Sequence, residues 1–251
     1  MSIDPSAIRI ATAGWAMPPS STPPDRLARA DSALTRYARV LPATEVNSSF
    51  HRHHRPSTYA RWAAATPAAF RFALKVPKAV THGARLELSA ALPVLERFLA
   101  EVGELGARRG PLLVQLPPSL AFDEPRVEAF LVALRARWSG SVACEPRHAS
   151  WFDTRADALL VAQRVARVAA DPARVPAAAE PGGWPGLVYV RWHGSPRTYY
   201  SSYDEAQLAG LAARLRALAA GPAEEVWCTF DNTAAGAALG NAMRLMELLR
   251  D

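Results

Sequence analysis

SVACEPRHASW, residues 141–151, shows most clearly how the chain is built. Residues 142–144 form an apolar run long enough for a buried strand, and the charged residues Glu145 and Arg147 follow closely. Because residues two apart on a strand point to the same face, these two side chains share a side. The stretch therefore predicts a buried strand that presents charge at its carboxyl end.

The same pattern, an apolar run that ends in a polar residue, recurs along the chain. Helical segments alternate with these runs, and the first helix is expected to start at an N-cap, Asp25 or Asp31, and to reach about Val40. After residue 171 the pattern lapses into a Pro- and Gly-rich stretch, which predicts a loop. The predicted strands span residues 8–14, 43–50, 70–76, 112–118, 142–144, 167–171, 187–192 and 226–230, and the later helices span 57–66, 89–105, 123–138, 156–165, 205–218 and 234–249.

This alternation predicts the fold class. Strands that alternate with helices favour a parallel sheet. The length of 251 residues is close to the roughly 250 residues typical of an eight-fold barrel. We therefore expect residues 1–251 to form a single domain, an α/β fold of the TIM-type (β/α)8 barrel kind, with the helix after strand 6 missing or replaced by a loop. In such barrels the functional site lies at the carboxyl ends of the strands.

Composition narrows the function classes. Half of the residues are apolar and 21% are charged, as in ordinary globular proteins. No apolar run approaches the roughly 20 residues of a membrane-spanning helix, and no secretory signal is recognisable, so we expect no membrane partner and a cytoplasmic location. The net charge of +6 is compatible with a nucleic acid, but the arginines are scattered and Lys75 and Lys78 are the only lysines. Nucleic acid is therefore the weaker interpretation.

The polar residues that end the predicted strands form one set. In a parallel barrel these side chains come together as a layer at the carboxyl face. Alternation places a second tier above the layer, formed by Asn47, Arg147 and His193, while the first strand contributes Gly14 and Trp15. The layer itself consists of Glu45, Lys75, Gln115, Glu145, Asp171, Arg191 and Asp231.

Two interpretations of this layer stay open. Desolvating an ionised group costs several kcal/mol unless it is paired, so the layer could be a compensated salt-bridge network that closes the barrel. Burying many charges gains little stability over apolar packing, however, which favours a ligand site. Glu145 is a candidate general base or a bidentate partner of an arginine, and His193 a proton-transfer group or a structural histidine. Nearby carboxylates should raise the pKa of Lys75, which favours electrostatic binding over Schiff-base chemistry.

Other polar groups suggest further sites. His51, His53, His54 and His82 do not have the spacing of a recognised zinc site, and the carboxylates with His193 could hold a divalent ion, although no metal or other cofactor is required. Asn232 and the loop after His193 occupy a place where barrels often bind phosphate, and a helix cap is the alternative. Tyr199, Tyr200 and Tyr203 could stack on a sugar or base, or could simply pack their own loop.

The order of motifs resembles a known family. The motifs are AGW, EVNSSFHR, FRFALKVPKAVTH, LLVQLPPS, CEPRHASW, VYVRWHG and FDNTAAGAALGNA, and together they are similar to domain-of-unknown-function family 72, also called the YecE-like family. The resemblance implies a TIM-type barrel and brings no established reaction. Ala13, His51 and Asp231 replace the Ser, Tyr and Asn that the family usually has. The motif positions are Trp15, Glu45, Asn47, Phe50, Lys75, His82, Gln115, Glu145, Arg147, Trp151, Asp171, Arg191, His193 and Asn232.

These observations predict binding and turnover of a small polar, anionic or carbohydrate-like ligand, by a hydrolase or an isomerase. Glu145, His193, Lys75 and Asp171 form the expected catalytic set, with Glu145 as base. A nucleic-acid-binding or metal-dependent nuclease-like protein and a non-catalytic ligand-sensing barrel are the alternatives. The expected ligand-binding residues are Trp15, Glu45, Asn47, His82, Gln115, Arg147, Arg191, Tyr200, Asp231 and Asn232.

Overall fold

The structure is a computed structural model that describes residues 8–17 and 32–250. Its first helix, α1 (Ala33–Tyr37), is capped by Ser32, and the predicted caps Asp25 and Asp31 lie outside the described residues. The further helices are α2 (Ser48–His51), α3 (Pro56–Ala64), α4 (Leu88–Val102), α5 (Glu124–Arg135), α6 (Thr154–Ala162), α7 (Glu205–Ala219) and α8 (Ala237–Arg250).

The strands form two sheets. The six-stranded sheet has the order β2 (Ala43–Val46), β3 (Arg71–Lys75), β4 (Arg109–Gln115), β5 (Val142–Glu145), β6 (Val165–Arg167) and β8 (Gly182–Gly183). The four-stranded sheet has the order β1 (Ile8–Thr12), β10 (Glu225–Phe230), β9 (Leu187–Trp192) and β7 (Ala169–Asp171). All pairings are parallel except β6 with β8. The fold is therefore mixed α/β with parallel sheets, as expected, but the strand pairing does not form one closed sheet.

The predicted sixth strand is split between the two sheets. β6 pairs with β5, and β7 pairs with β9. Val168 lies between them, and its backbone N–H still donates to the carbonyl of Cys144 at 2.9 Å. At the other edges of the two sheets, Ala13 forms a parallel bridge with Glu45. The Gly14 N–H also donates to the Glu45 carbonyl, at 2.8 Å. The two sheets are thus joined between β1 and β2 by these backbone contacts, and on the other side by the chain that runs from β6 through Val168 into β7.

One other predicted element differs from the structure, and the segment after β7 agrees with its prediction. The second strand ends at Val46, and residues 48–51 form the short helix α2 instead of continuing the strand. The segment after β7, fully described, contains a short turn of 3-10 helix at Pro176–Ala179 and strand β8, and no α-helix, as the Pro- and Gly-rich sequence predicts.

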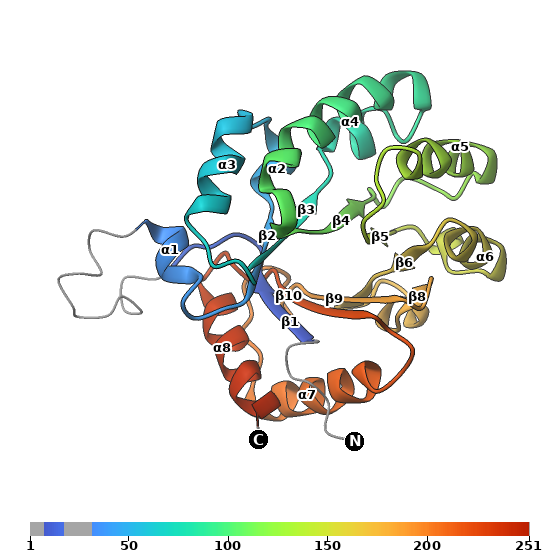
Figure 1. The fold of residues 1–251 in the computed structure, drawn as a ribbon. Coiled ribbons are helices and arrows are strands. Elements are labelled where there is room, and N and C mark those ends of the chain that lie inside the picture. The colour runs from blue at the N-terminus through green and yellow to red at the C-terminus, as the bar shows by residue number, and fades with distance from the viewer. Residues whose placement is uncertain (1–7, 18–31, 251) are drawn as a thin grey trace.

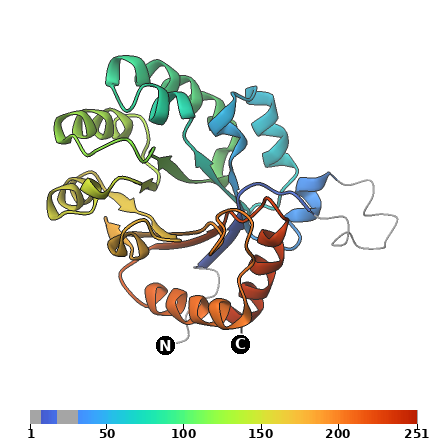
Figure 2. The same cartoon turned by 180° about the vertical axis from the view of Figure 1, so that it is seen from behind.

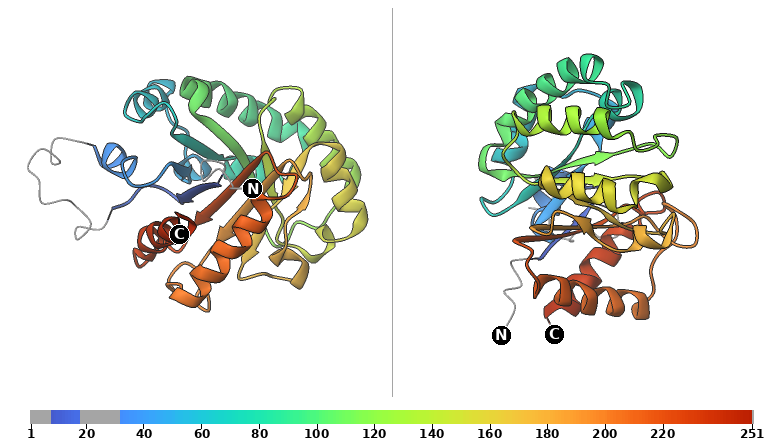
Figure 3. Two further views of the ribbon diagram at one scale, coloured as in Figure 1. Left: turned by 60° about the horizontal axis from the view of Figure 1, so that its bottom comes forward. Right: turned by 90° about the vertical axis from the view of Figure 1, so that its right-hand side faces the viewer.

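The helices lie around the outside of the strands (Figures 1 and 2). Their ends follow local rules: Asp123 and Asp153 accept the first free backbone N–H groups of α5 and α6, and Asp204 forms a capping box with Gln207 at the start of α7. The views in Figure 3 show α7 and α8 beside the four-stranded sheet. Among the described residues, no helix is both long and apolar enough to cross a membrane.

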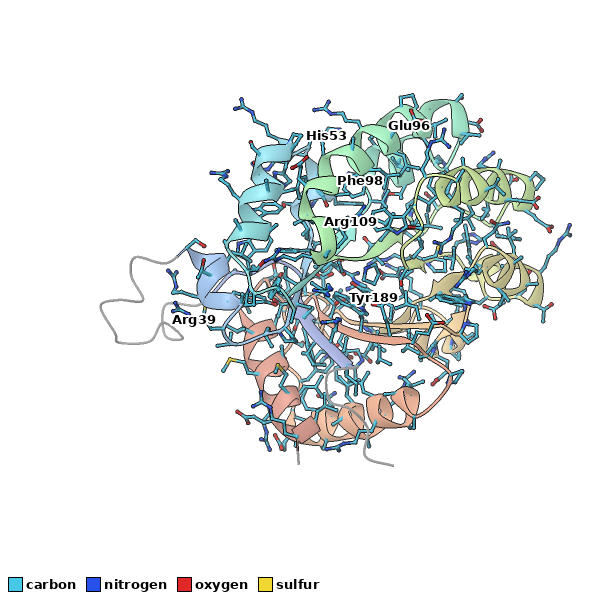
Figure 4. All side chains as sticks on the ribbon, in the orientation of Figure 1. Arg39, His53, Glu96, Phe98, Arg109 and Tyr189 are labelled. Carbon is cyan, nitrogen blue, oxygen red and sulfur yellow. The ribbon has the colours of Figure 1, made fainter. Side chains whose placement is uncertain are left out.

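A small cluster of buried side chains, called here the inner cluster, is formed mainly by residues from the strands of both sheets. It is separate from the larger core between strands and helices. Many of its members are alanines, which leave room for the large rings of Tyr189 and Trp227 that stack in parallel with centroids 6.0 Å apart. Figure 4 labels Tyr189 among the strands. The inner cluster consists of Ala11, Ala43, Ala73, Leu113, Ala143, Ala166, Val168, Leu187, Tyr189 and Trp227.

Candidate functional site

The inner cluster determines which polar side chains meet at the carboxyl ends of the strands. Residues two apart on a strand share a face, so the residue two positions after an inner-cluster member points the same way. Glu45 follows Ala43, Lys75 follows Ala73, and the same spacing holds on three more strands. Asp231 lies four positions after Trp227 and therefore also points the same way. The side chains placed in this layer are Glu45, Lys75, Gln115, Glu145, Arg191 and Asp231.

Arg191 is the centre of the layer and has no exposed surface (0%). Its Nε and Nη2 donate to the two carboxylate oxygens of Glu45 at 3.0 and 2.7 Å. Its Nη1 donates to Glu145 at 2.7 Å, and Nη2 also donates to Asp231 at 3.1 Å. One guanidinium therefore holds three carboxylates, the forked geometry for which arginine is suited.

His193 lies in the tier above and joins two of these carboxylates. Its Nε2 is 2.9 Å from Glu145 Oε1, and its Nδ1 is 3.0 Å from Asp231 Oδ2. Although burial alone would lower it, the neighbouring Glu145 carboxylate raises the pKa of His193 above its usual value. The imidazole is therefore held as a cation that donates from both nitrogens.

Glu145 and Asp231 in turn stay ionised, because the neighbouring cations stabilise their carboxylate forms. Burial alone would raise the pKa of Glu145, but Arg191 and His193 hold it well below its usual range. Burial likewise opposes ionisation of Asp231, and Arg191 with His193 lowers the pKa of Asp231 to about 2. A carboxylate with so low a pKa is a weak general base.

Four further side chains complete the shell around the carboxylates. Gln115 donates to Glu145 at 2.8 Å, and Arg147 does so at 3.3 Å. The Tyr189 hydroxyl donates to Glu45 at 2.9 Å, and Asn47 donates to Asp231 at 3.4 Å. Asn47 was predicted in the tier above Glu45, on the same face of its strand. Tyr189 lies inside an apolar run and was missed. Its position two residues before Arg191 is the signal that could have found it.

Lys75 differs from every other charged member of the layer. Its side chain is only 6% exposed, yet within the described part of the chain its Nζ makes no hydrogen bond and no ion pair. The ammonium lies over the Phe50 ring, 4.3 Å from the centroid. Burial and the nearby Arg191 lower the pKa of Lys75. The expected rise was wrong, because the carboxylates already face Arg191 and compensate Lys75 too weakly.

Asp171 does not belong to the layer, and its predicted place there was wrong. On this segment the inward positions are Ala166 and Val168, so the layer position is Ala170. Asp171 accepts a hydrogen bond from the Tyr203 hydroxyl at 2.7 Å, outside the network of Arg191. The sequence offered no alternation of polar and apolar residues here from which the inward face could be read.

The remaining predicted residues lie around or away from the layer. His82 borders it, with its ring 5.1 Å from that of Phe50. Trp15 packs edge-on against Trp62, with ring centroids 4.9 Å apart. Two others lie apart from the network: Asn232 donates to Asn241 and to the carbonyl of Ser201, and Tyr200 is 46% exposed beneath the guanidinium of Arg197.

One hollow borders the layer and a second lies near Phe50. The first, of about 340 Å³, is bordered by Glu145, Arg147, His193, Arg174 and Ala170, among others. The second, of about 450 Å³, is bordered by Phe50, His82 and Lys78, among others. Volumes of this size suit a small ligand. Both hollows have basic side chains at their walls.

The charge balance of the layer differs from the one the sequence suggested. With Asp171 outside and His193 cationic, the carboxylates are Glu45, Glu145 and Asp231. The cations are Arg191, His193, Arg147 and Lys75 when protonated. With Lys75 protonated, four cations therefore face three carboxylates, and a negatively charged ligand would neutralise the remaining positive charge.

The carboxylates of the layer are also the candidate ligands of a divalent ion. Among residues 8–17 and 32–250, no group of three or more His, Cys, Asp or Glu side chains has the arrangement of a metal site. The carboxylates that could surround a divalent ion converge on the guanidinium of Arg191 instead.

Comparisons place the chain among known proteins. The family model described as "Protein of unknown function DUF72" matches residues 9–251, which confirms the resemblance seen in the motifs. No curated protein matched significantly.

Solved structures show the same fold. A DUF72 family protein from Enterococcus faecalis has 21% identity and a TM-score of 0.80, covering 97% of this chain and 96% of its own. A DUF72 family protein from Thermotoga maritima has 21% identity and a TM-score of 0.75, covering 97% and 99%. The 3-keto-D-glucoside 4-epimerase from E. coli has 13% identity and a TM-score of 0.50, covering 97% and 100%.

Proposed function

The chain belongs to the DUF72 family, and we propose that it binds a small, hydroxyl-rich, negatively charged ligand of the sugar-acid type beside Lys75 and catalyses an isomerisation. The observation that carries this proposal is Lys75: its side chain is only 6% exposed, and its ammonium has no hydrogen-bond or ion-pair partner among the described residues. Removing most of the water around such a group without providing a partner is costly. A ligand oxygen would supply the missing partner.

A second unpaired group supports a polar ligand. The Oδ1 atom of Asn47 is buried and accepts no hydrogen bond, although Nδ2 of the same amide donates to Asp231. A ligand hydroxyl could donate to this oxygen while it accepts from the ammonium of Lys75. Together with the surplus of positive charge, these groups favour a ligand that carries both hydroxyls and a carboxylate or phosphate.

We propose that the two sheets act as one (β/α)8 barrel, a single domain, whose mouth holds this ligand. Two observations support this view: Ala13, directly after β1, forms a parallel bridge with Glu45 of β2, and β6 of one sheet continues through Val168 directly into β7 of the other. The carboxyl ends of the strands would then surround the layer, where barrels of this class carry their sites.

The chemistry we propose is proton transfer at a carbon next to a carbonyl. Lys75 is assigned as the group that exchanges the proton, since a lowered pKa brings an amine closer to neutral pH. Glu145 and His193 are assigned to positioning, because both are engaged with each other and their charges are fixed. The structural neighbour from E. coli is a 3-keto-D-glucoside 4-epimerase, which supports this reaction class.

The test uses the only two lysines of the chain as a matched pair. Purified protein is incubated in heavy water with 2-keto-D-gluconate or a 3-keto-D-glucoside, and NMR follows deuterium incorporation next to the carbonyl. We expect exchange by the wild type and by Lys78→Met, and none by Lys75→Met.

Calorimetry with D-gluconate and D-glucose 6-phosphate separates binding from turnover. Binding of either anion that is lost in Lys75→Met but kept in Lys78→Met supports the ligand class. If binding occurs and no probe exchanges deuterium, the isomerase assignment fails and a ligand-sensing protein is indicated. If none of these compounds binds, the ligand proposal is overturned.

A further inference from the structure

A cluster of arginines lies at the opposite ends of the strands from the Arg191 network. Arg71 and Arg109 are the first residues of β3 and β4, and Arg9 is the second residue of β1. Because residues two apart share a face, Arg9 and Arg71 point the same way as the inner-cluster residues Ala11 and Ala73. Their side chains therefore converge at the amino ends of the strands.

These arginines border a hollow of about 420 Å³, together with Arg137, Trp138 and Glu225. Glycines form part of its wall. A Cβ atom on Gly110 would come within 2.8 Å of the Trp227 ring, so the inner cluster closes the hollow directly behind that glycine. Figure 4 labels Arg109, whose guanidinium lies 5.2 Å from the ring centroid of Trp138.

The positive charge of this hollow is poorly compensated. Among its arginines, Arg137 pairs with Glu96 at 2.8 Å. Within the described part of the chain, Arg9, Arg71 and Arg109 form no ion pair. The single carboxylate in the wall, Glu225, accepts hydrogen bonds from the Ser141 hydroxyl at 2.7 Å and from the Trp227 indole at 3.0 Å.

The donors of two arginines also remain largely unused. Among residues 8–17 and 32–250, Arg9 donates only to the carbonyl of Ala69, at 3.4 Å. Arg71 uses only Nη1 within the same residues, toward Ala68 and Phe70 at 2.8 and 3.0 Å. Burial and the neighbouring Arg71 lower the pKa of Arg9, whereas Glu225 partly offsets them. Two cations thus border one hollow in which Glu225 is the only carboxylate among the described lining residues.

We propose that this hollow is an anion-binding site for a small phosphate compound that carries more than one negative charge, such as a diphosphate or a phosphate ester. Guanidinium groups match phosphate oxygens with paired N–H donors, and the unused donors of Arg9 and Arg71 are available for this purpose. The volume accommodates a diphosphate group with part of an organic substituent. This site is independent of the one proposed beside Lys75.

The test measures binding of inorganic pyrophosphate to the full chain by calorimetry at fixed ionic strength. Arg9→Gln is the preferred variant, because the one hydrogen bond that the Arg9 side chain makes among the described residues is long. We expect it to weaken binding at least about tenfold, the effect of losing one charge-assisted contact. Thermal unfolding without pyrophosphate should show no loss of stability, because the change removes repulsion between Arg9 and Arg71.

Two control variants decide whether pyrophosphate occupies this hollow. Arg61→Gln removes an exposed charge from α3 and should leave the affinity unchanged. Lys75→Met should also leave it unchanged. Equal weakening by Arg61→Gln would show that net charge alone attracts the anion. Loss in Lys75→Met with full binding in Arg9→Gln would place pyrophosphate at the carboxyl face. Either result, or no binding by the wild type, overturns the proposal.

Discussion

Replacing Arg191 by methionine tests how the buried layer is held together. The change keeps the volume roughly constant and removes the cation that contacts Glu45, Glu145 and Asp231. Removing one partner of a buried ion pair costs about 3–5 kcal/mol. Because three carboxylates lose their partner, we expect a loss at the upper end of this range at neutral pH. That is a large part of the roughly 5–15 kcal/mol that stabilises a typical protein.

The pH dependence of this loss shows whether it comes from the ionised carboxylates. Arg191 and its neighbours lower the folded-state pKa of Glu145 and Asp231, so the stability they contribute is present above their unfolded-state pKa values and is lost as pH falls. The difference between wild type and Arg191→Met should therefore be largest above about pH 4.5. It should shrink as pH falls toward the pKa of Asp231, about 2.

Urea unfolding followed by tryptophan fluorescence measures both quantities. Arg61→Met, on the exposed side of α3, is the matched control and should change stability by less than about 0.5 kcal/mol. In the double variant with Glu45→Gln the loss should be smaller than the sum of the single losses. A loss below about 1 kcal/mol at neutral pH, or one that does not change with pH, would refute the account of Arg191 as the central cation.

Three smaller predictions follow from neighbouring contacts. Asp231→Asn removes the negative charge of an acceptor of His193 and should lower the imidazole pKa. The stability that protonated His193 contributes is then lost at a lower pH as pH rises. NMR titration measures the imidazole pKa, and an unchanged value would contradict the pairing. Tyr189→Phe removes one donor to Glu45 and should cost about 1–3 kcal/mol in urea unfolding; no change would contradict the contact. Asp171→Ala should cost about 1 kcal/mol through the lost Tyr203 contact and leave deuterium exchange intact, whereas loss of exchange would return Asp171 to the site.

The sequence was sufficient for the arrangement of the layer where strands alternate clearly. On β5, apolar residues lead directly into Glu145, and the spacing of two to Arg147 shows that both side chains share a face. The same rule placed Glu45, Gln115 and Arg191 correctly. Each of these predictions needed only the strand and its period.

Other features depended on contacts between distant strands. Asp171 was misplaced because Val168, Ala169 and Ala170 put apolar residues on both faces of the predicted strand, so the period gives no inward direction. The pKa of Lys75 was expected to rise, but the nearby carboxylates are already paired with Arg191. The sequence does not show this pairing. The cationic state of His193 likewise requires Glu145 and Asp231 to lie on either side of its ring.

The most direct test of the central claim is the free energy of unfolding of Lys75→Met, without ligand, at neutral pH. If Lys75 is an unpaired group kept for a ligand, the variant should be at least as stable as the wild type and as Lys78→Met, since a buried ammonium is replaced by an apolar side chain of similar length. If Lys75 is instead a member of a salt-bridge network that closes the strand ends, the variant should lose about 3–5 kcal/mol. A loss of that size would contradict the account.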